Sequence, residues 1–236
     1  MKLVILCGGL GSRLSEETKI IPKPLVKIGN KPILWHIMKY YKSYNNNEFI
    51  LALGYKGKMI ENYFKNNRKD GFNIQFAYTG QNTQTGSRLL KLKKYLKNEE
   101  NFMLTYGDGL CNVNLNKLKQ FHLKEKPIGT VTAVNPPVRF GELSIKKNKV
   151  SAFREKSTTK TNWISGGYFI FNKCFFDLIP SGNDSILETQ PFSKLVKKKK
   201  FNAFKHHGFW QCMDTMREKK ILNKLWYTKK APWKNW

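Results

Sequence analysis

The sequence predicts an α/β fold with a doubly wound, mostly parallel sheet and a smaller β elaboration in its second half. Three observations support this prediction. Strand-like and helix-like patterns alternate with short connections through residues 1–135, which is typical of parallel crossover units. A glycine-rich turn follows the first strand directly. Hydrophobic residues make up 40% of the 236 residues, enough to bury the core of a single domain.

The first half is expected to alternate strands with helices whose apolar residues recur at helical spacing. The predicted strands are Leu3–Cys7, Glu48–Leu53, Asn73–Thr79, Asn101–Tyr106 and Gly129–Val134. The predicted helices are Pro32–Tyr44, Met59–Asn66, Ser87–Lys97 and Asn114–Lys124, the last opened by Asn114 as a cap. Ligands of such sheets bind at the carboxyl ends of the strands.

After Pro136-Pro137 the pattern changes to shorter pieces, which we interpret as a substrate-side elaboration of the same domain. The predicted strands are Leu143–Ile145, Lys149–Arg154, Trp163–Phe171 and Phe201–Lys205, and the predicted helices are Ile186–Lys198 and Thr215–Trp226. We therefore predict one domain, 1–236, with a first half at 1–135 and a second at 136–236.

The amino-acid composition indicates which partners and which cellular location to expect for this protein. Lys and Arg total 43 against 16 Asp and Glu, a formal charge of +27, but the only lysine block, Lys197–Lys200, is short. We expect these basic residues to form a solvated surface and the protein to have no nucleic acid partner. A basic nucleic-acid-binding protein is the alternative outside this class. No run of apolar residues is long enough for the hydrophobic core of a signal peptide or for a membrane span, and the four cysteines lie far apart in the sequence. We expect a cytoplasmic protein without a membrane partner.

The glycine-rich turn, Gly8 to Arg13, is suited to phosphate because backbone amides can converge there without obstruction by side chains. It is not a Walker loop, since Gly-Lys-Ser/Thr is absent, and Leu14 occupies the last glycine position of a dinucleotide motif. Arg13 adds a fork-shaped cation suited to polyphosphate. An ordinary turn is an equally good interpretation of this feature alone.

Three charged residues strengthen the case for a phosphate site. Lys23 lies between two prolines, which are expected to hold it in an extended conformation. Asp108 ends a predicted strand between glycines, and Asp214 follows the apolar stretch Gly208–Met213. Two such carboxylates could hold one Mg²⁺ with nucleotide phosphates. The alternatives are a solvated surface lysine and, for Asp214, an ordinary helix cap.

Taken together, these motifs resemble the sugar nucleotidyltransferases, most closely the glucose-1-phosphate cytidylyltransferases, over nearly the whole chain. The segments that carry the resemblance are Leu6–Thr18, Pro22–Pro24, Lys31–Met38, Leu53–Gly57, Thr79–Gly80, Thr85–Leu89, Thr105–Gly109, Arg139–Gly141, Phe153–Lys156, Gly208–Gln211 and Ala231–Trp236.

The resemblance implies that CTP and α-D-glucose 1-phosphate give CDP-glucose and pyrophosphate with Mg²⁺, for polysaccharide or deoxysugar synthesis, in a homo-oligomer. It implies catalytic roles for Arg13, Lys23 and Asp108, and metal binding by Asp108 and Asp214. The implied nucleotide-binding residues are Leu6, Gly8, Gly9, Leu10, Gly11, Ser12, Arg13, Lys23, Thr83, Arg88 and Gly107. The implied sugar-phosphate residues are Gly141, Glu155, Lys156 and Gly167.

The chain departs from the family pattern mainly on the sugar side. Ser157 stands where the family usually has proline, Ser165 where it has asparagine, and Gln190 where it has a second glutamate. The stretch between Tyr63 and Thr79 is about twenty residues shorter than the family leads us to expect. A nucleotidyltransferase of the same fold that uses another base or another sugar 1-phosphate is therefore the main alternative.

Overall fold

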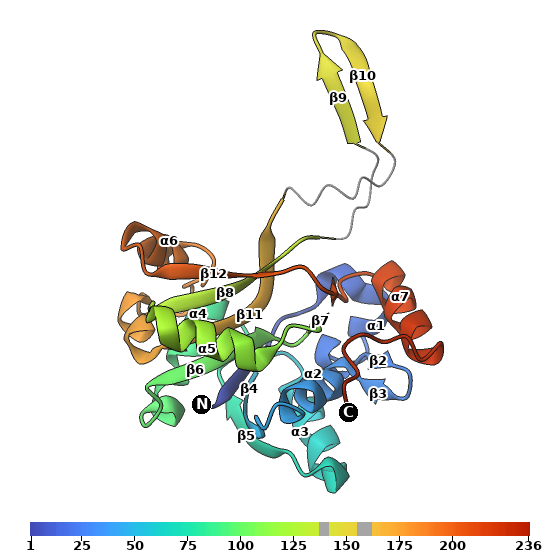
Figure 1. Cartoon of the computed structure of the whole chain (residues 1–236). Helices are drawn as coiled ribbons and strands as arrows, with labels where there is room; N and C mark the ends of the chain where they lie inside the picture. Colours follow the sequence, from blue (N-terminus) through green and yellow to red (C-terminus); the bar gives the residue numbers. More distant parts are fainter. Residues whose placement is uncertain (137–141, 155–161) are drawn as a thin grey trace.

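The computed structural model describes residues 1–136, 142–154 and 162–236. Its centre is a seven-stranded sheet with the order β12-β8-β11-β6-β1-β4-β5 (Figure 1). The strands are β1 (Leu3–Cys7), β4 (Glu48–Leu53), β5 (Asn73–Tyr78), β6 (Asn101–Tyr106), β8 (Gly129–Val134), β11 (Ile164–Asn172) and β12 (Phe201–His206). Only β11 runs antiparallel to its neighbours, so the predicted mostly parallel α/β sheet is confirmed.

Helices and short strand pairs surround this sheet. The α-helices are α1 (Ser15–Thr18), α2 (Ile33–Lys42), α3 (Gly57–Asn66), α4 (Thr85–Leu90), α5 (Leu115–Glu125), α6 (Gln190–Lys197) and α7 (Met216–Tyr227). The 3₁₀ turns are η1 (Ser12–Leu14), η2 (Lys23–Leu25), η3 (Arg68–Asp70), η4 (Lys93–Leu96) and η5 (Lys173–Leu178). The short pairs join β2 (Lys27–Ile28) with β3 (Lys31–Pro32), β7 (Gly109–Cys111) with β13 (Trp210–Cys212), and β9 (Glu142–Lys146) with β10 (Lys149–Arg154).

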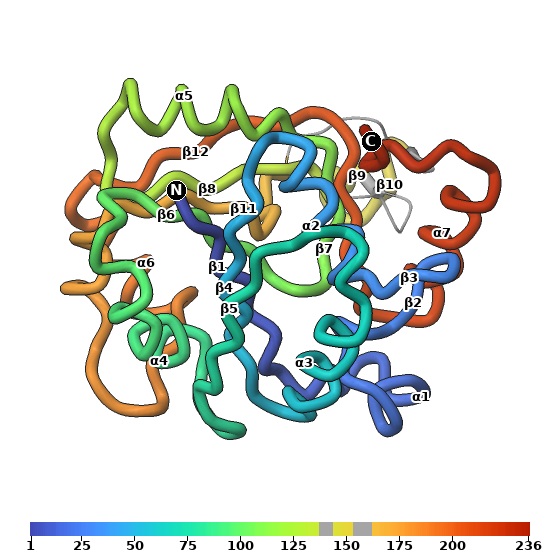
Figure 2. Tube along the Cα trace, turned by 90° about the horizontal axis from the view of Figure 1, so that it is seen from below, coloured from blue at the N-terminus to red at the C-terminus, as the bar shows by residue number. Residues whose placement is uncertain are grey.

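Both faces of the sheet are covered by hydrophobic clusters. Successive residues of a strand point to opposite sides of the sheet, so one buried strand contributes to both clusters. In β1, Leu3 and Ile5 belong to one hydrophobic cluster and Val4 and Leu6 to the other. Residues of α2, α3, α5 and α7 complete the first cluster, and residues of α4, η4, η5 and α6 complete the second. Figure 2 shows α5 along one side of the sheet and α4 and α6 on the other.

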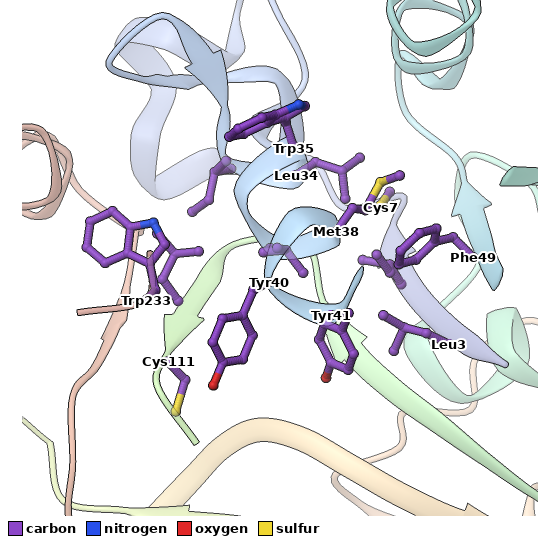
Figure 3. Close-up of a cluster of buried hydrophobic side chains, with 14 of the residues drawn as sticks. Leu3, Cys7, Leu34, Trp35, Met38, Tyr40, Tyr41, Phe49, Cys111 and Trp233 are labelled. Carbon is purple, nitrogen blue, oxygen red and sulfur yellow. The ribbon is translucent and has the colours of Figure 1, made fainter. Parts of the chain in front are cut away.

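The first cluster explains why α2 is apolar almost all round. Eight of its ten residues are buried, and its aromatic side chains pack between β1 and the C-terminal Trp233 (Figure 3). The ring of buried His36 is edge-on to Trp226 and accepts a hydrogen bond at Nδ1 from Trp233 Nε1. The chain's last residues are thereby fixed against a helix near its beginning.

The place of β11 could not be read from the sequence, although its strand pattern could. It inserts between β6 and β8, with Tyr168 opposite Thr105. Its pairing with β8 is irregular between Ser165 and Phe169. Within this stretch Gly167 has φ +76°, and a Cβ there would lie 2.8 Å from the ring of Tyr106. Glycine is therefore required for Tyr106 to pack against β11.

Two predicted helices are corrected. Residues 87–97 form the end of α4 and then η4, instead of one helix. The helix predicted from Ile186 begins only at Gln190, because the segment before it hydrogen-bonds to the start of α4 and Pro191 favours a helix start. The other predicted elements are confirmed with ends within two residues. No helix in the described ranges has both the length and the apolar character needed to cross a bilayer.

Candidate active site

A cavity of about 500 Å³ opens at the carboxyl end of β1 and β6, where the fold class predicts a ligand. Its lining comes from the glycine-rich turn, the Lys23 turn, the loop before α4 and the end of β6. The predicted site residues that line it are Leu6, Gly8, Gly9, Leu10, Gly11, Ser12, Arg13, Lys23, Thr83, Arg88, Gly107 and Asp108. Segments separated by up to 100 residues in the chain therefore form one concave surface.

The glycine-rich turn owes its shape to two different requirements. Gly11 has φ +67°, a left-handed conformation, and a Cβ there would lie 2.9 Å from Thr18 Cγ2. Gly8 instead makes room for a side chain, since a Cβ on it would lie 2.2 Å from the guanidinium carbon of Arg88. Gly9 faces open space. Arg88 thus packs against the inner side of the turn at Gly8, while the outer side at Gly9 stays accessible.

Arg88 is 4% exposed and its guanidinium donates to backbone carbonyl oxygens at several strand ends. Nη1 donates to Leu53 O at 3.0 Å and Gly80 O at 3.0 Å, and Nη2 donates to Thr83 O at 2.8 Å and Gly8 O at 3.3 Å. Burial lowers the pKa of this guanidinium below its usual value, which still leaves it charged near neutral pH. Arg88 therefore fixes the floor of the cavity.

Lys23 lies at the centre of the site. Instead of the extended conformation that its flanking prolines predict, it begins η2, and its ammonium lies between two carboxylates. The Lys23 Nζ is 2.5 Å from Asp108 Oδ2 and 2.5 Å from Asp214 Oδ1. Arg13, which is otherwise exposed, places Nη1 2.8 Å from Asp214 Oδ2. The two cations and two anions predicted as functional residues are thus assembled into one network.

This network stabilises the charged forms of Asp214 and Lys23. Burial opposes ionisation of Asp214, but the hydrogen bond and charge of Lys23, with the charge of Arg13, lower the pKa of its carboxyl. Burial also disfavours the Lys23 ammonium, yet the charges and hydrogen bonds of Asp108 and Asp214 raise its pKa. Both groups are therefore charged at neutral pH.

Asp214 is placed by its neighbours in the second half of the chain. It follows β13 and precedes α7, whose N-cap is Thr215 and not Asp214. Glu218 completes a capping box and its Oε2 also accepts from Asp214 N at 2.6 Å. Met213 N donates to Asp108 O at 2.9 Å, which joins the two segments that carry the carboxylates.

The donor set at Lys23 suits a hard divalent cation. Oxygens of Asp108 and Asp214 converge on a single positive charge, and carboxylate oxygens are the ligands that Mg²⁺ prefers. Cys212, Asp214 and Glu218 also lie within 4.8 Å of one another. Burial, with the nearby carboxylates, raises the pKa of the Cys212 thiol to about 12, so it stays protonated and is a poor ligand. Asp108 and Asp214 are the better pair.

A second, smaller cavity of about 60 Å³ shares Tyr106 and Asp108 with the first. Gly167 and Ser165 line it, and Trp210 lies over it with Nε1 donating to Gly166 O at 2.7 Å. Of the predicted sugar-phosphate residues only Gly167 is therefore placed, because Gly141, Glu155 and Lys156 lie outside the described residues, as does Ser157.

The sequence did not single out several residues of the site. Tyr106 lines both cavities but was not predicted as a site residue, although it directly precedes the predicted residues Gly107 and Asp108. The loop residues Gln81, Asn82 and Gln84 and the first residue of α4, Thr85, also line the larger cavity. Polar residues are ordinary in a loop, so no sequence signal would have found Gln81, Asn82 and Gln84.

Comparison with known proteins agrees with this geometry. The family model described as "Nucleotidyl transferase" matches residues 2–217. The chain belongs to the nucleotidyl transferase family. A glucose-1-phosphate cytidylyltransferase from Salmonella typhimurium is 42% identical over 258 aligned residues that cover 100% of both chains.

More distant relatives extend the comparison. A D-glycero-alpha-D-manno-heptose 1-phosphate guanylyltransferase from Aneurinibacillus thermoaerophilus is 34% identical over 212 residues, 89% of each chain. Among solved structures, HddC from Yersinia pseudotuberculosis superposes with a TM-score of 0.74 at 24% identity over 95% of this chain and 99% of that one. That likeness supports the nucleotidyl transferase fold.

Proposed function

We propose that this nucleotidyl transferase moves the cytidylyl group of CTP to α-D-glucose 1-phosphate, which yields CDP-glucose and pyrophosphate. The observation that carries the proposal is the Lys23–Asp108–Asp214 network beside the glycine-rich cavity, in a chain aligned end to end with a relative of that name. A cavity of about 500 Å³ is large enough for a nucleotide.

In this proposal an oxygen of the sugar phosphate attacks the α-phosphorus of the nucleotide in line, and pyrophosphate leaves from the opposite side. The backbone of Gly8–Ser12 surrounds the polyphosphate, and exposed Arg13 neutralises the departing phosphates. Lys23 stabilises the negative charge that builds on the α-phosphate. Thr83 and Arg88 shape the floor under the base, and Gly107 lets the ribose approach.

Asp108 and Asp214 would hold Mg²⁺, and the ion would supply Lewis-acid neutralisation of the phosphate oxygens. The chain's own contribution is to bring these two carboxylates together from the turn after β6 and the segment after β13. Gly167, with Gly141, Glu155 and Lys156, is proposed to bind the sugar phosphate. This assigns nucleotide binding to residues 1–135 and sugar binding to residues 136–236, in a cytoplasmic homo-oligomer.

The experiment is pyrophosphate release by the purified protein with Mg²⁺ and glucose 1-phosphate, with CTP, UTP, GTP, ATP and dTTP offered separately. Release with CTP alone supports the proposal. Asp108→Asn is expected to lose turnover by at least about a hundredfold, since the variant lacks one of the two carboxylates that would hold the Mg²⁺ neutralising the reacting phosphates. Normal turnover in that variant would refute the role of Asp108 in metal binding.

A second candidate is a guanylyltransferase acting on another sugar 1-phosphate, because the heptose-phosphate enzyme covers 89% of the chain at 34% identity. Release with GTP in the same panel, or release only when another sugar phosphate replaces glucose 1-phosphate, would favour it. The nucleic-acid-binding alternative instead predicts silence with every nucleotide and salt-sensitive retention on DNA.

A further inference from the structure

One wall of the larger cavity is held by a segment from the second half of the chain. Residues 183–188 precede α6 and pack along the start of α4, where Gly86 N and Ser87 N both donate to Ser185 O at 2.8 and 3.1 Å. This carbonyl satisfies two N–H groups that a helix N-terminus leaves unpaired. A Cβ on Gly86 would lie 2.6 Å from Ser185 Oγ, so the two segments are in close contact.

Glu188, at the end of this segment, uses both carboxylate oxygens. Oε2 accepts from Thr85 Oγ1 at 3.0 Å, and Oε1 accepts from the Tyr106 hydroxyl. The Thr85 oxygen also accepts from Leu187 N at 3.0 Å. Because Thr85 and Tyr106 both line the larger cavity, one carboxylate joins the first residue of α4 to the last residue of β6.

Tyr106 lines both cavities, together with Asp108. Its ring packs against Gly167 on one side and is edge-on to Phe169 at 6.0 Å between centroids. Burial, with the nearby Glu188 charge, raises the pKa of its phenol, so the hydroxyl stays protonated and donates. Packing therefore fixes the ring and Glu188 fixes its polar end.

We infer that Glu188 is a positioning residue for both substrates: it holds Tyr106, which lines both the nucleotide cavity and the sugar cavity, and Thr85, which lines the nucleotide cavity. This inference rests on the proposed function, which assigns those two cavities. Glu188 does not reach the Lys23 network through any hydrogen bond that the described residues show. Its loss is therefore expected to weaken substrate binding and to leave the transfer step nearly unchanged.

The test is Glu188→Ala, assayed with the nucleotide and sugar phosphate that the wild-type protein uses best. KM for each substrate is expected to rise about three- to tenfold, the range for one or two lost hydrogen bonds, while kcat stays within about twofold. Glu188→Gln is expected to restore KM, because its amide oxygen can accept from Tyr106 and its NH₂ can donate to Thr85. Asp184→Ala, an exposed acid on the same segment, is the matched control and should change neither constant.

A double-mutant cycle shows whether Glu188 acts through Tyr106. Tyr106→Phe removes only the hydroxyl, so the double variant with Glu188→Ala should be less impaired than the sum of the single effects predicts. Full additivity, an unchanged KM in Glu188→Ala, or a kcat that falls while KM stays constant would each overturn the inference. Glutamine as damaging as alanine would also overturn it, since the carboxylate charge itself would then be needed.

Nucleotide dissociation constants from calorimetry separate this inference from the proposed function. The ratio of the dissociation constants of wild-type protein and Glu188→Ala measures the change in nucleotide affinity, and it requires no turnover. An inactive wild-type protein would refute the proposed function, while a three- to tenfold weaker nucleotide affinity in Glu188→Ala would still support the positioning role. Equal affinities would refute that role even in an active enzyme.

Discussion

Replacing Lys23 with methionine tests whether the two carboxylates of the site form one cation-binding point. Methionine keeps the length and apolar contacts of the side chain and removes only the ammonium. The Lys23 side chain is 11% exposed and lies 2.5 Å from an oxygen of each carboxylate, whereas Asp108 is 30% and Asp214 is 14% exposed. The variant therefore leaves two partly buried anions close together without their shared cation.

Removing one partner of a fully buried ion pair costs about 3–5 kcal/mol. Solvent screening of Asp108 lowers the expected loss to about 2 kcal/mol of unfolding free energy, or about 4–8 °C in thermal midpoint for a domain of this size. Mg²⁺ is expected to recover part of this loss, by about 1.4 kcal/mol at ten times its dissociation constant. The wild-type protein should gain much less from Mg²⁺ without nucleotide, because Lys23 occupies the same point.

The assay is thermal unfolding of both proteins at pH 7.5 over a series of Mg²⁺ concentrations, with no nucleotide present. Lys93→Met is the matched control, since Lys93 pairs with Asp177 at 3.5 Å where both side chains are more than half exposed. Such a pair contributes at most about 1 kcal/mol, and neither its loss nor Mg²⁺ should move the midpoint much. Equal Mg²⁺ responses in wild type and Lys23→Met would refute the shared cation point.

Two further predictions concern the cavity floor and the core. Gly8→Ala is expected to destabilise the protein by about 1–3 kcal/mol and to weaken nucleotide affinity, because its Cβ would displace the Arg88 guanidinium. Gly9→Ala is the control for stability: no atom of the chain lies within 4 Å of its Cβ, so unfolding experiments should show no loss. Burial lowers the pKa of His36 and of His122 to about 4, so the unfolded chain binds more protons below pH 6.5 and stability must fall as the pH decreases. Denaturant titrations at pH 7 and pH 5 should differ by about 2 kcal/mol per histidine, and a His122→Gln variant that keeps the full pH effect would contradict this.

The sequence predicted the strands of the sheet well because each is a short buried run between clear turn signals, as in Leu3–Cys7 and Glu48–Leu53. It also predicted that Asp108 and Asp214 come together, and Asp108 lies just beyond the carboxyl end of β6, where ligands of such sheets bind. Asp214 instead follows β13, which pairs with β7 outside the main sheet. These features depend on local pattern and on a general rule of topology.

The features that were missed depend on long-range packing. Residues 186–189 have helical composition, but hydrogen bonds to the start of α4 hold the segment before them, and residues 187–189 form a turn, so α6 begins late. Arg88 was predicted as a nucleotide-binding residue, and its carbonyl partners could not be foreseen because they lie at the ends of three separate strands, β1, β4 and β5. Glu188 gave no signal, since its two partners lie 82 and 103 residues away in the chain.

The same distances explain why the site belongs to the whole chain. The Lys23–Asp214 contact spans 191 residues, and Asp214 is placed by β13, which pairs with β7, and by the cap of α7. The tail beyond α7 in turn packs on α2 through Trp233 and His36. A chain that folds only its first half would therefore form the glycine-rich turn without the second carboxylate. Because non-local contacts repay their loop-closure entropy only when the sheet is complete, the cation-binding point and the native fold should form together.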